Sequence, residues 1–267
     1  MTTFVSRLVV GIVGVPLVLG MVWLGGWWFF ALVVAAALVA VHEFVTMARP
    51  LRPLAPAAYA GTLLGLAGAR TGGLVWLLGG VLATFAFAFV LNAFAETRPP
   101  ATVAVGATIF GAAWIGFGLG FLLLLRELEV KGRLIVFTVL LTVFAADTLA
   151  YFGGRLLGRH KLAPTLSPGK TWEGFVVGSL AGVFVSFVAL YDTRSTYLTI
   201  WEAVVLGIVV VLAAAAGDLF ESALKRDMEV KDTGRLLGGH GGILDRVDSL
   251  LFAGIAAYYL VLAFGYG

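Results

Sequence analysis

The sequence predicts an all-α protein, a polytopic transmembrane bundle of about nine helices that forms a single integral membrane domain over residues 1–267. Of the 267 residues, 61% are hydrophobic and only 12% are charged, whereas soluble domains carry about 25% charged residues. The mean hydropathy is +1.03. Apolar runs recur along the chain at about the 20-residue length that a helix needs to cross the hydrocarbon core.

Nine apolar segments are expected to be helices. Because the apolar character of the first continues to Phe30 without a convincing small-residue cleavage site, we interpret it as a membrane helix and not as a signal peptide. The third is short and contains glycines, so we expect it to be tilted or partly buried. The segments are Leu8–Leu24, Trp27–Met47, Leu54–Ala69, Gly73–Ala95, Ala101–Leu125, Leu134–Phe152, Phe175–Tyr191, Trp201–Phe220 and Val247–Phe264.

Charge and cysteine content limit the functional classes. A formal charge of +3 is ordinary for a membrane protein with basic loops, so nucleic-acid binding is not expected, and the absence of cysteine excludes disulfides and Cys-ligated zinc. Thirteen Lys and Arg residues fall on the face with the two long polar loops, 153–173 and 221–246, against five on the other. The positive-inside rule then places these loops in the cytoplasm. Nine of the thirteen belong to the loops, and without them four basic residues remain against five, so the charge count outside the loops does not decide the orientation.

A group of polar residues lies at the end of the eighth segment. If its helix continues, Asp218, Glu221, Ser222 and Lys225 share one face, because they are spaced i, i+3, i+4 and i+7. A carboxylate and an ammonium at a membrane boundary are typical of metal and phosphate binding. The alternative is a simple helix end that is held by a Glu221–Lys225 pair.

A second group precedes the last segment. Asp245, Asp248 and Ser249 fall on one face of its first helical turn, directly after a Gly-Gly-His-Gly-Gly run. Helix capping alone explains one acidic residue there, but it does not explain two. Together with Asp218, these carboxylates could supply oxygen ligands to one or two Mg²⁺ ions.

Acidic residues also lie inside apolar segments. Asp147 is several residues within such a run, where a carboxylate costs roughly 2.5–3.5 kcal/mol on insertion scales, so it needs a partner. A structural pair with Arg155 and a role in metal or nucleotide binding both remain open. Near the end of the second segment, His42 and Glu43 are interpreted as an interfacial pair.

The loop 161–173 has a sequence pattern that is compatible with phosphate binding, although basic loops of this kind are common. Two prolines and Gly169 prevent a helix before Lys170. Ser167, Lys170 and Thr171 would then sit at a helix N-terminus, where backbone N–H groups favour an anion. The spacing is not that of a Walker P-loop.

The stretch Ser222–Asp248 resembles the signature of phosphatidate cytidylyltransferases, also called CDP-diacylglycerol synthases. Over 27 residues it reads SALKRDMEVKDTGRLLGGHGGILDRVD. The loop KLAPTLSPGKTWEG and the Asp147 segment are similar to further stretches of that family, so the resemblance covers residues 147–249 closely. The sequence departs from the family at Gly169, where a second lysine is usual.

The resemblance implies a catalytic segment at 147–249 that makes CDP-diacylglycerol and pyrophosphate from CTP and phosphatidic acid, with Mg²⁺, in phospholipid biosynthesis. The phosphate monoester of phosphatidic acid is already an oxyanion near neutral pH, so no Ser, Cys or His nucleophile is required. The reaction needs in-line positioning and neutralisation of charge on the triphosphate and on the leaving pyrophosphate.

Candidate roles follow from the resemblance and from the residue types. The expected metal ligands are Asp218, Asp245 and Asp248. The expected catalytic residues are these three with Lys225 and Arg226. The expected substrate-binding residues, with His240 in a flexible lid, are Asp147, Lys161, Ser167, Lys170, Thr171, Lys231, Arg235 and His240.

Two other functions share parts of this pattern. A CTP-dependent lipid kinase, such as a polyprenol kinase, would also use CTP and Mg²⁺ but would transfer the γ-phosphate. A transporter would also bury acidic residues, although it normally places charges near the bilayer midplane. For the cytidylyltransferase we expect CTP, phosphatidic acid and the lipid bilayer as partners, and a homodimer is compatible with it. The expected location is the inner membrane of a bacterium, with the active site facing the cytoplasm.

Overall fold

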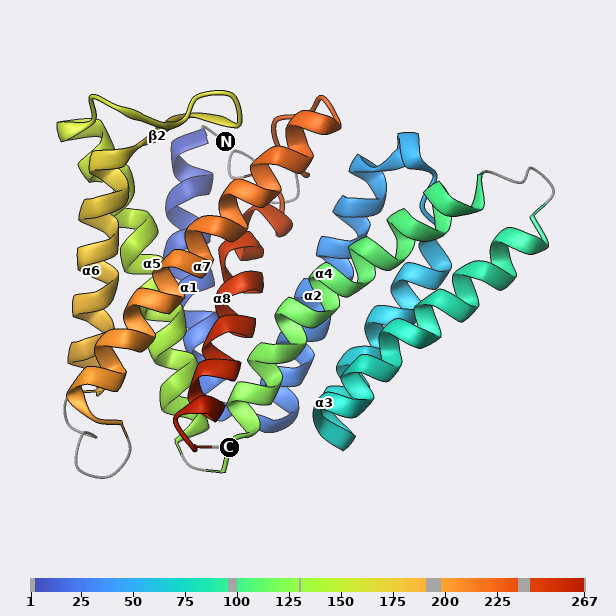
Figure 1. Cartoon of the computed structure of the whole chain (residues 1–267), viewed down its shortest axis with the longest axis horizontal. Coiled ribbons are helices and arrows are strands. Elements are labelled where there is room, and N and C mark those ends of the chain that lie inside the picture. Colours follow the sequence, from blue (N-terminus) through green and yellow to red (C-terminus); the bar gives the residue numbers. More distant parts are fainter. Residues whose placement is uncertain (1–2, 96–99, 130, 191–197, 235–240, 267) are drawn as a thin grey trace. The chain divides into compact units, whose positions relative to one another are not determined.

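A computed structural model describes residues 3–95, 100–129, 131–190, 198–234 and 241–266. These residues form eight α-helices, one 3₁₀ turn and one short β-hairpin (Figure 1). In chain order the elements are α1 (Thr3–Leu24), α2 (Gly26–Met47), η1 (Arg49–Leu51), α3 (Ala55–Ala93), α4 (Ala101–Glu127), α5 (Gly132–Leu157), β1 (Lys161–Ala163), β2 (Ser167–Thr171), α6 (Trp172–Leu190), α7 (Ile200–Asp227) and α8 (Leu244–Ala263).

The helices have the length and composition of membrane spans. Within the described residues, the seven helices from α2 to α8 are long and apolar enough to cross a bilayer, and the apolar part of α1 that can be assessed is the shorter stretch Val13–Leu24. The protein is therefore an integral membrane protein of the all-α class, as the sequence predicts.

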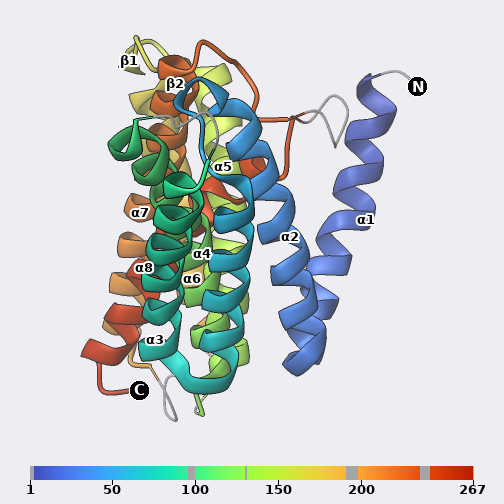
Figure 2. The ribbon, with the colours of Figure 1, turned by 90° about the vertical axis from the view of Figure 1, so that its right-hand side faces the viewer.

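Helix α3 consists of two antiparallel arms that meet at Gly73 (Figure 2). Gly73 has φ 72° and ψ −154°, a backbone conformation that is open only to glycine without strain. Small residues line the contact between the arms: a Cβ added at Gly68 would lie 2.5 Å from the carbonyl oxygen of Trp76. The two arms match the expected segments Leu54–Ala69 and Gly73–Ala95, so each of the nine predicted segments corresponds to a helical segment of the described residues.

The chain forms two compact units. The first contains residues 1–124 and 227–247, and the second contains residues 125–226 and 248–267. Helix α8 therefore begins in the first unit and continues in the second.

In the first unit, aromatic and small residues join α2 to α4. The Phe44 ring of α2 lies 5.8 Å from Phe110 and 6.3 Å from Trp114, measured between ring centroids. Gly111, between these two, leaves room for the Phe44 ring. This packing fixes the end of α2 at which His42 and Glu43 lie.

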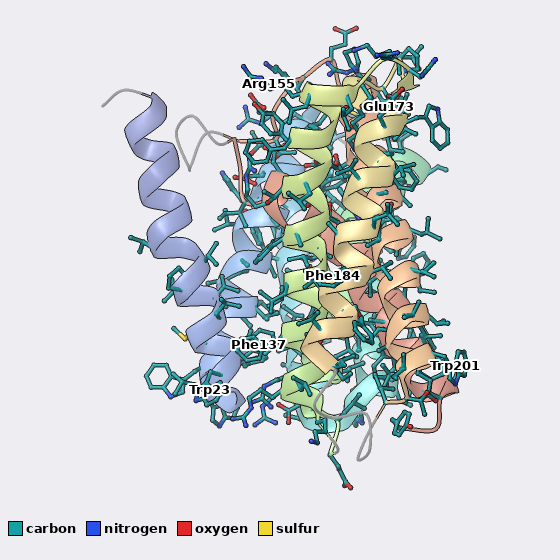
Figure 3. All side chains as sticks on the ribbon, turned by 90° about the vertical axis from the view of Figure 1, so that its left-hand side faces the viewer. Trp23, Phe137, Arg155, Glu173, Phe184 and Trp201 are labelled. Atoms are coloured by element: carbon teal, nitrogen blue, oxygen red, sulfur yellow. The ribbon has the colours of Figure 1, made fainter. Side chains whose placement is uncertain are left out.

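In the second unit, a stripe of small residues brings α6 against α5. The buried residues of α6 are Gly174, Gly178, Gly182, Ser186 and Leu190, a strict four-residue repeat. Added Cβ atoms at the first three would collide with the α5 backbone or Ala146, or with Val211 of α7. Small residues at this spacing let membrane helices approach closely. The two helices run side by side in Figures 1 and 3.

The hairpin β1–β2 connects these two helices at one end. The strands are antiparallel, with Lys161 opposite Thr171 and Ala163 opposite Ser167. In Figure 3, Arg155 near the end of α5 and Glu173 at the start of α6 lie at this same end. The absence of helix before Lys170 was predicted, but the strands were not. The expected placement of Ser167 and Lys170 at a helix N-terminus is wrong, because both belong to β2 and α6 begins only at Trp172.

Candidate active site

A lysine of the hairpin pairs with an aspartate of α7 in the second unit. The Lys170 Nζ lies 2.5 Å from a carboxylate oxygen of Asp218, and both side chains are about one third exposed or less. Both were predicted site residues, one for phosphate and one for metal. The structure brings them together even though 48 residues separate them in the sequence.

A second acidic residue of α7 is completely buried. Glu221 is 0% exposed, and its Oε2 accepts a hydrogen bond of 2.8 Å from Lys225 Nζ. The Glu221–Lys225 pair that the sequence offered as a simple helix-end interaction is therefore present. The other oxygen, Oε1, has no hydrogen-bond donor among the described residues, and a buried oxygen without a donor is costly.

The Glu221 carboxyl lies beside Asp248 of α8. Asp248 is 7% exposed, and the two carboxyl groups are within hydrogen-bonding reach of each other. Gly217 explains this proximity, because its missing side chain allows the α7 backbone to approach the Asp248 carbonyl oxygen. The rings of Phe220 and Phe252, with centroids 5.3 Å apart, pack beside this contact.

Four carboxylates from three helices form what we call the acidic cluster: Asp147, Asp218, Glu221 and Asp248. The charges of Asp218 and Asp147 both act on Asp248. Buried carboxylates repel one another unless a proton or a cation lies between them. Within the described ranges, no three acidic or histidine side chains come together closely enough to form a ready-made metal site.

The remaining basic candidate of α7 contacts the hairpin. The Arg226 Nε donates a 3.2 Å hydrogen bond to the carbonyl oxygen of Leu166, in the turn between the strands. The predicted catalytic Arg226 therefore lies against the loop that contains Lys170. Lys161, predicted to bind phosphate, is exposed on the opposite strand.

Backbone N–H groups at the start of α6 and in the loop before β1 donate hydrogen bonds to side-chain oxygens of the protein. The Thr171 hydroxyl accepts a 3.1 Å hydrogen bond from Gly174 N–H, as an N-cap residue does. Glu173 accepts hydrogen bonds from the backbone N–H groups of Arg159 and His160. Ser167 lies at the far end of β2, five residues before the helix begins.

In the first unit, Asp245 forms hydrogen bonds with residues on both sides of the segment 235–240. Its Oδ2 accepts hydrogen bonds from the N–H of Thr233 (3.0 Å), the hydroxyl of Thr233 (2.9 Å) and the N–H of Gly242 (2.7 Å). This predicted metal ligand therefore has a structural role within the first unit. Asp245 and Asp248 lie one turn apart on α8, as predicted, but Asp245 belongs to the first unit.

Glu43 of α2 meets the same segments. It is 5% exposed and accepts hydrogen bonds from Ile243 N–H (3.0 Å) and Leu244 N–H (2.8 Å). His42 instead contacts the Tyr59 hydroxyl at 2.9 Å. The predicted interfacial His42–Glu43 pair is wrong, because the two adjacent side chains leave the helix in different directions and bind different partners.

Two acidic residues for which the sequence indicated no catalytic, metal or substrate role are buried in the structure, Glu43 in the first unit and Glu221 in the second. Each is an acidic residue near the end of an apolar helix. Because burying such a charge is costly, their positions in the sequence already indicated that each needs a partner. Lys231 is exposed in the structure. Arg235 and His240, predicted to bind substrate, lie outside the described residues.

Comparison with known proteins gives one consistent family. The family model described as "Cytidylyltransferase family" matches residues 5–264. The chain is 34% identical to the phosphatidate cytidylyltransferase of Mycobacterium bovis, over 96% of this chain and 87% of that protein. It is also 34% identical to the phosphatidate cytidylyltransferase of Mycobacterium tuberculosis H37Rv, over 96% of this chain and 81% of that protein. The one from Haemophilus influenzae is 41% identical over 46% of this chain and 43% of that protein.

Proposed function

Because the chain belongs to the cytidylyltransferase family, we propose that it transfers the cytidylyl group of CTP to phosphatidic acid, forming CDP-diacylglycerol and pyrophosphate. The observation that carries this proposal is the Lys170–Asp218 contact, because it joins the lysine that we expect to bind phosphate to a carboxylate of the acidic cluster. Similarity along almost the whole chain to relatives named phosphatidate cytidylyltransferase supports the same substrates.

The proposed chemistry needs no protein nucleophile. An oxygen of the phosphatidic acid phosphate attacks the α-phosphorus of CTP, a new P–O bond forms, and the bond from the α-phosphorus to the bridging oxygen of the β-phosphate breaks. Pyrophosphate leaves with that electron pair. The residues have to hold the two phosphates in line and offset their negative charge. We assign this task to three basic residues: Lys170, which pairs with Asp218, Lys225, which pairs with Glu221, and Arg226, which contacts the hairpin that contains Lys170.

The acidic cluster fits Mg²⁺. Mg²⁺ is usually held by one or two carboxylates together with substrate phosphate oxygens, which agrees with carboxylates that approach in pairs and do not enclose a ready-made site. Glu221 Oε1, buried without a donor, and the adjoining Asp248 carboxyl are oxygens that a cation would satisfy. Glu221 and Asp248 would hold the ion together with substrate phosphate oxygens, and Asp218 and Asp245 stay predicted ligands. Bound Mg²⁺ would neutralise charge on the triphosphate and on the leaving pyrophosphate.

We place the active site at the cytoplasmic surface of a bacterial inner membrane. CTP is a cytosolic substrate, whereas phosphatidic acid lies in the membrane, so the site has to reach both at one interface. The excess of basic residues on the face with the two polar loops supports this orientation, and the relatives named above come from bacteria.

Product analysis tests this function. Purified protein in detergent is incubated with phosphatidic acid and CTP that is radiolabelled in the α-phosphate, and lipids are then extracted. We expect label in a CDP-lipid and one pyrophosphate released for each lipid formed. A parallel reaction contains a polyprenol and CTP that is labelled in either the α- or the γ-phosphate. Transfer of label to the polyprenol from γ-labelled CTP alone, with CDP as the second product, would instead identify a lipid kinase. Absence of label from both lipids would overturn nucleotide-dependent lipid chemistry.

A further inference from the structure

We propose that Glu43 is a positioning residue that fixes the start of α8 and the two loop flanks, residues 231–234 and 241–243, and thereby holds Asp245 in place for catalysis. The catalytic part of this inference rests on the proposed function. The structural part, that Glu43 fixes the flanks, rests only on contacts within the first unit.

The contacts of Glu43 join segments that are distant in the sequence. Its Oε1 accepts from Ile243 N–H at 3.0 Å, and its Oε2 accepts from Leu244 N–H at 2.8 Å. The Thr233 hydroxyl lies 3.4 Å from the same Oε2 and 2.9 Å from Asp245 Oδ2. One threonine therefore connects the two carboxylates, and Glu43 contacts both flanks about 190 to 200 residues further along the chain.

The glycines beside Glu43 show that the fit is close. A Cβ added to Gly234 or to Gly242 would collide with the Glu43 carboxylate. One glycine comes from each flank. Since both flanks lie against the same carboxylate, a change in the position of Glu43 would shift both flanks.

The charge of Glu43 suits this location. The N–H groups in the first turn of a helix have no partners within the helix, and the helix dipole favours an anion there. A carboxylate accepts at both oxygens, as Ile243 N–H and Leu244 N–H require. An amide in its place would direct N–H₂ toward one of these donors, so glutamine cannot satisfy both.

These contacts also decide how phosphate can be recognised. Glycine-rich segments at a helix N-terminus often bind phosphate through backbone N–H groups. Here the N–H groups of Gly242, Ile243 and Leu244 are directed at protein carboxylates. While these bonds exist, that backbone is not available to phosphate. The role of the flanks is therefore to place side chains, and Asp245 is the one that they hold.

Glu202 provides a matched control in the second unit. It is 8% exposed, and its Oε2 accepts a 2.7 Å hydrogen bond from Thr199 N–H at the start of α7. Glu43 and Glu202 are thus both buried carboxylates that bind backbone N–H groups at the start of a helix. Glu43→Gln and Glu202→Gln remove the same charge, and only the first lies against the loop flanks. Glu43→Asp keeps the charge but shortens the side chain by one methylene group.

Three measurements on full-length protein in detergent test the proposal: the melting temperature, kcat and KM for CTP, and the rate at which trypsin cuts after Lys231, identified by mass spectrometry. Cleavage needs local opening, so it reports whether the flank is held. For Glu43→Gln we expect cleavage about tenfold faster and kcat about tenfold lower, with KM for CTP changed less than about threefold. Its melting temperature should fall no further than that of Glu202→Gln, and Glu43→Asp should recover part of kcat.

The outcomes separate the two proposals. If cleavage after Lys231 is as slow in Glu43→Gln as in the wild type, Glu43 does not fix the flanks. If cleavage accelerates but kcat stays within about twofold of wild type, or if Glu202→Gln loses as much kcat, the positioning role is wrong. If the wild type itself does not convert CTP, the proposed function and the catalytic role both fail, and the cleavage rate alone decides whether Glu43 anchors the flanks.

Discussion

The ammonium group of Lys170 lies 2.5 Å from a carboxylate oxygen of Asp218. This contact connects the β2 strand to α7, and Arg226 of α7 makes a second connection, to the carbonyl oxygen of Leu166 in the turn that precedes β2. In the proposed reaction, CTP brings an anion for Lys170 and Mg²⁺ brings a cation for Asp218.

Replacement of Lys170 should weaken the use of CTP. Lys170→Ala removes a positive charge that faces the triphosphate, and we expect KM for CTP to rise about tenfold or more, the effect of losing one charge-assisted hydrogen bond. Lys170→Arg, which keeps the charge, should lie between alanine and wild type. Steady-state kinetics with CTP varied at saturating phosphatidic acid give the answer. Unchanged KM and kcat in Lys170→Ala would mean that the hairpin serves only to connect α5 and α6.

Neutralisation of Asp245 should abolish turnover while the protein stays folded. Asp245→Asn preserves the volume of the side chain but removes the charge that we assign to Mg²⁺, and we expect kcat to fall about 100-fold or more. An asparagine oxygen can still accept from Gly242 N–H, so the melting temperature should change little. Asp227→Asn, at the exposed end of α7, is the control for loss of one acidic residue. Retained turnover in Asp245→Asn would remove Asp245 from the mechanism.

Mg²⁺ should stabilise the wild type through Glu221 and Asp248. A ligand that binds only the folded state raises the melting temperature, and the buried carboxyl pair is where we expect that binding. After treatment with EDTA, adding Mg²⁺ should raise the melting temperature of the wild type and restore its turnover. In Glu221→Gln the rise should be lost, whereas Glu202→Gln should keep it. Full turnover in metal-free buffer, or an equal rise in Glu221→Gln, would contradict the proposed metal site.

The close contact between α5 and α6 should tolerate no added methyl group at its centre. In Gly178→Ala the new Cβ would lie 2.7 Å from the Cβ of Ala150 and 3.0 Å from its backbone nitrogen. Overpacking of this kind costs about 1–3 kcal/mol, so the melting temperature should fall. Gly79→Ala, in α3, meets no atom within 4 Å and should be neutral or stabilising, because alanine favours a helix. Equal melting temperatures for the two variants would show that α6 does not need the glycine stripe.

Features that depend on local sequence could be predicted. The nine apolar segments correspond to helical segments because hydrophobic length alone determines which stretches can be stable in lipid. Even the division of α3 was visible, since the apolar pattern is interrupted next to Gly73. The strands β1 and β2 were not predicted, because Pro164, Pro168 and Gly169 indicate only that a helix is excluded and do not specify what replaces it.

Features of the site that depend on distant pairing could not be predicted in the same way. The spacing of Asp218, Glu221 and Lys225 gave their common helix face, but it did not show that Asp248 lies beside Glu221. That proximity depends on where α7 and α8 approach at Gly217. Glu43 was wrongly paired with His42, because its partners are the backbone N–H groups of Ile243 and Leu244, about 200 residues away. A sequence does not indicate which carboxylate will bind a given N–H.

Gly169 is the position at which the resemblance to phosphatidate cytidylyltransferases departs, because a second lysine is usual there. Successive side chains of a strand point to opposite faces. Since Lys170 of β2 is directed at Asp218, a side chain at position 169 would point away from that carboxylate. Position 169 is exposed, and an added Cβ meets no atom within 4 Å. Gly169→Lys should therefore fold normally.

The kinetic effect of Gly169→Lys should be small. A lysine on the outer face can act on CTP only through screened, long-range attraction. We expect KM for CTP to fall by less than about threefold at 0.15 M salt, with a larger fall at low ionic strength. Gly169→Gln, of similar length but uncharged, is the control. A fall of about tenfold that persists at high salt would show that residue 169 touches the nucleotide directly, and the outward orientation of this position would then be wrong for the nucleotide-bound enzyme.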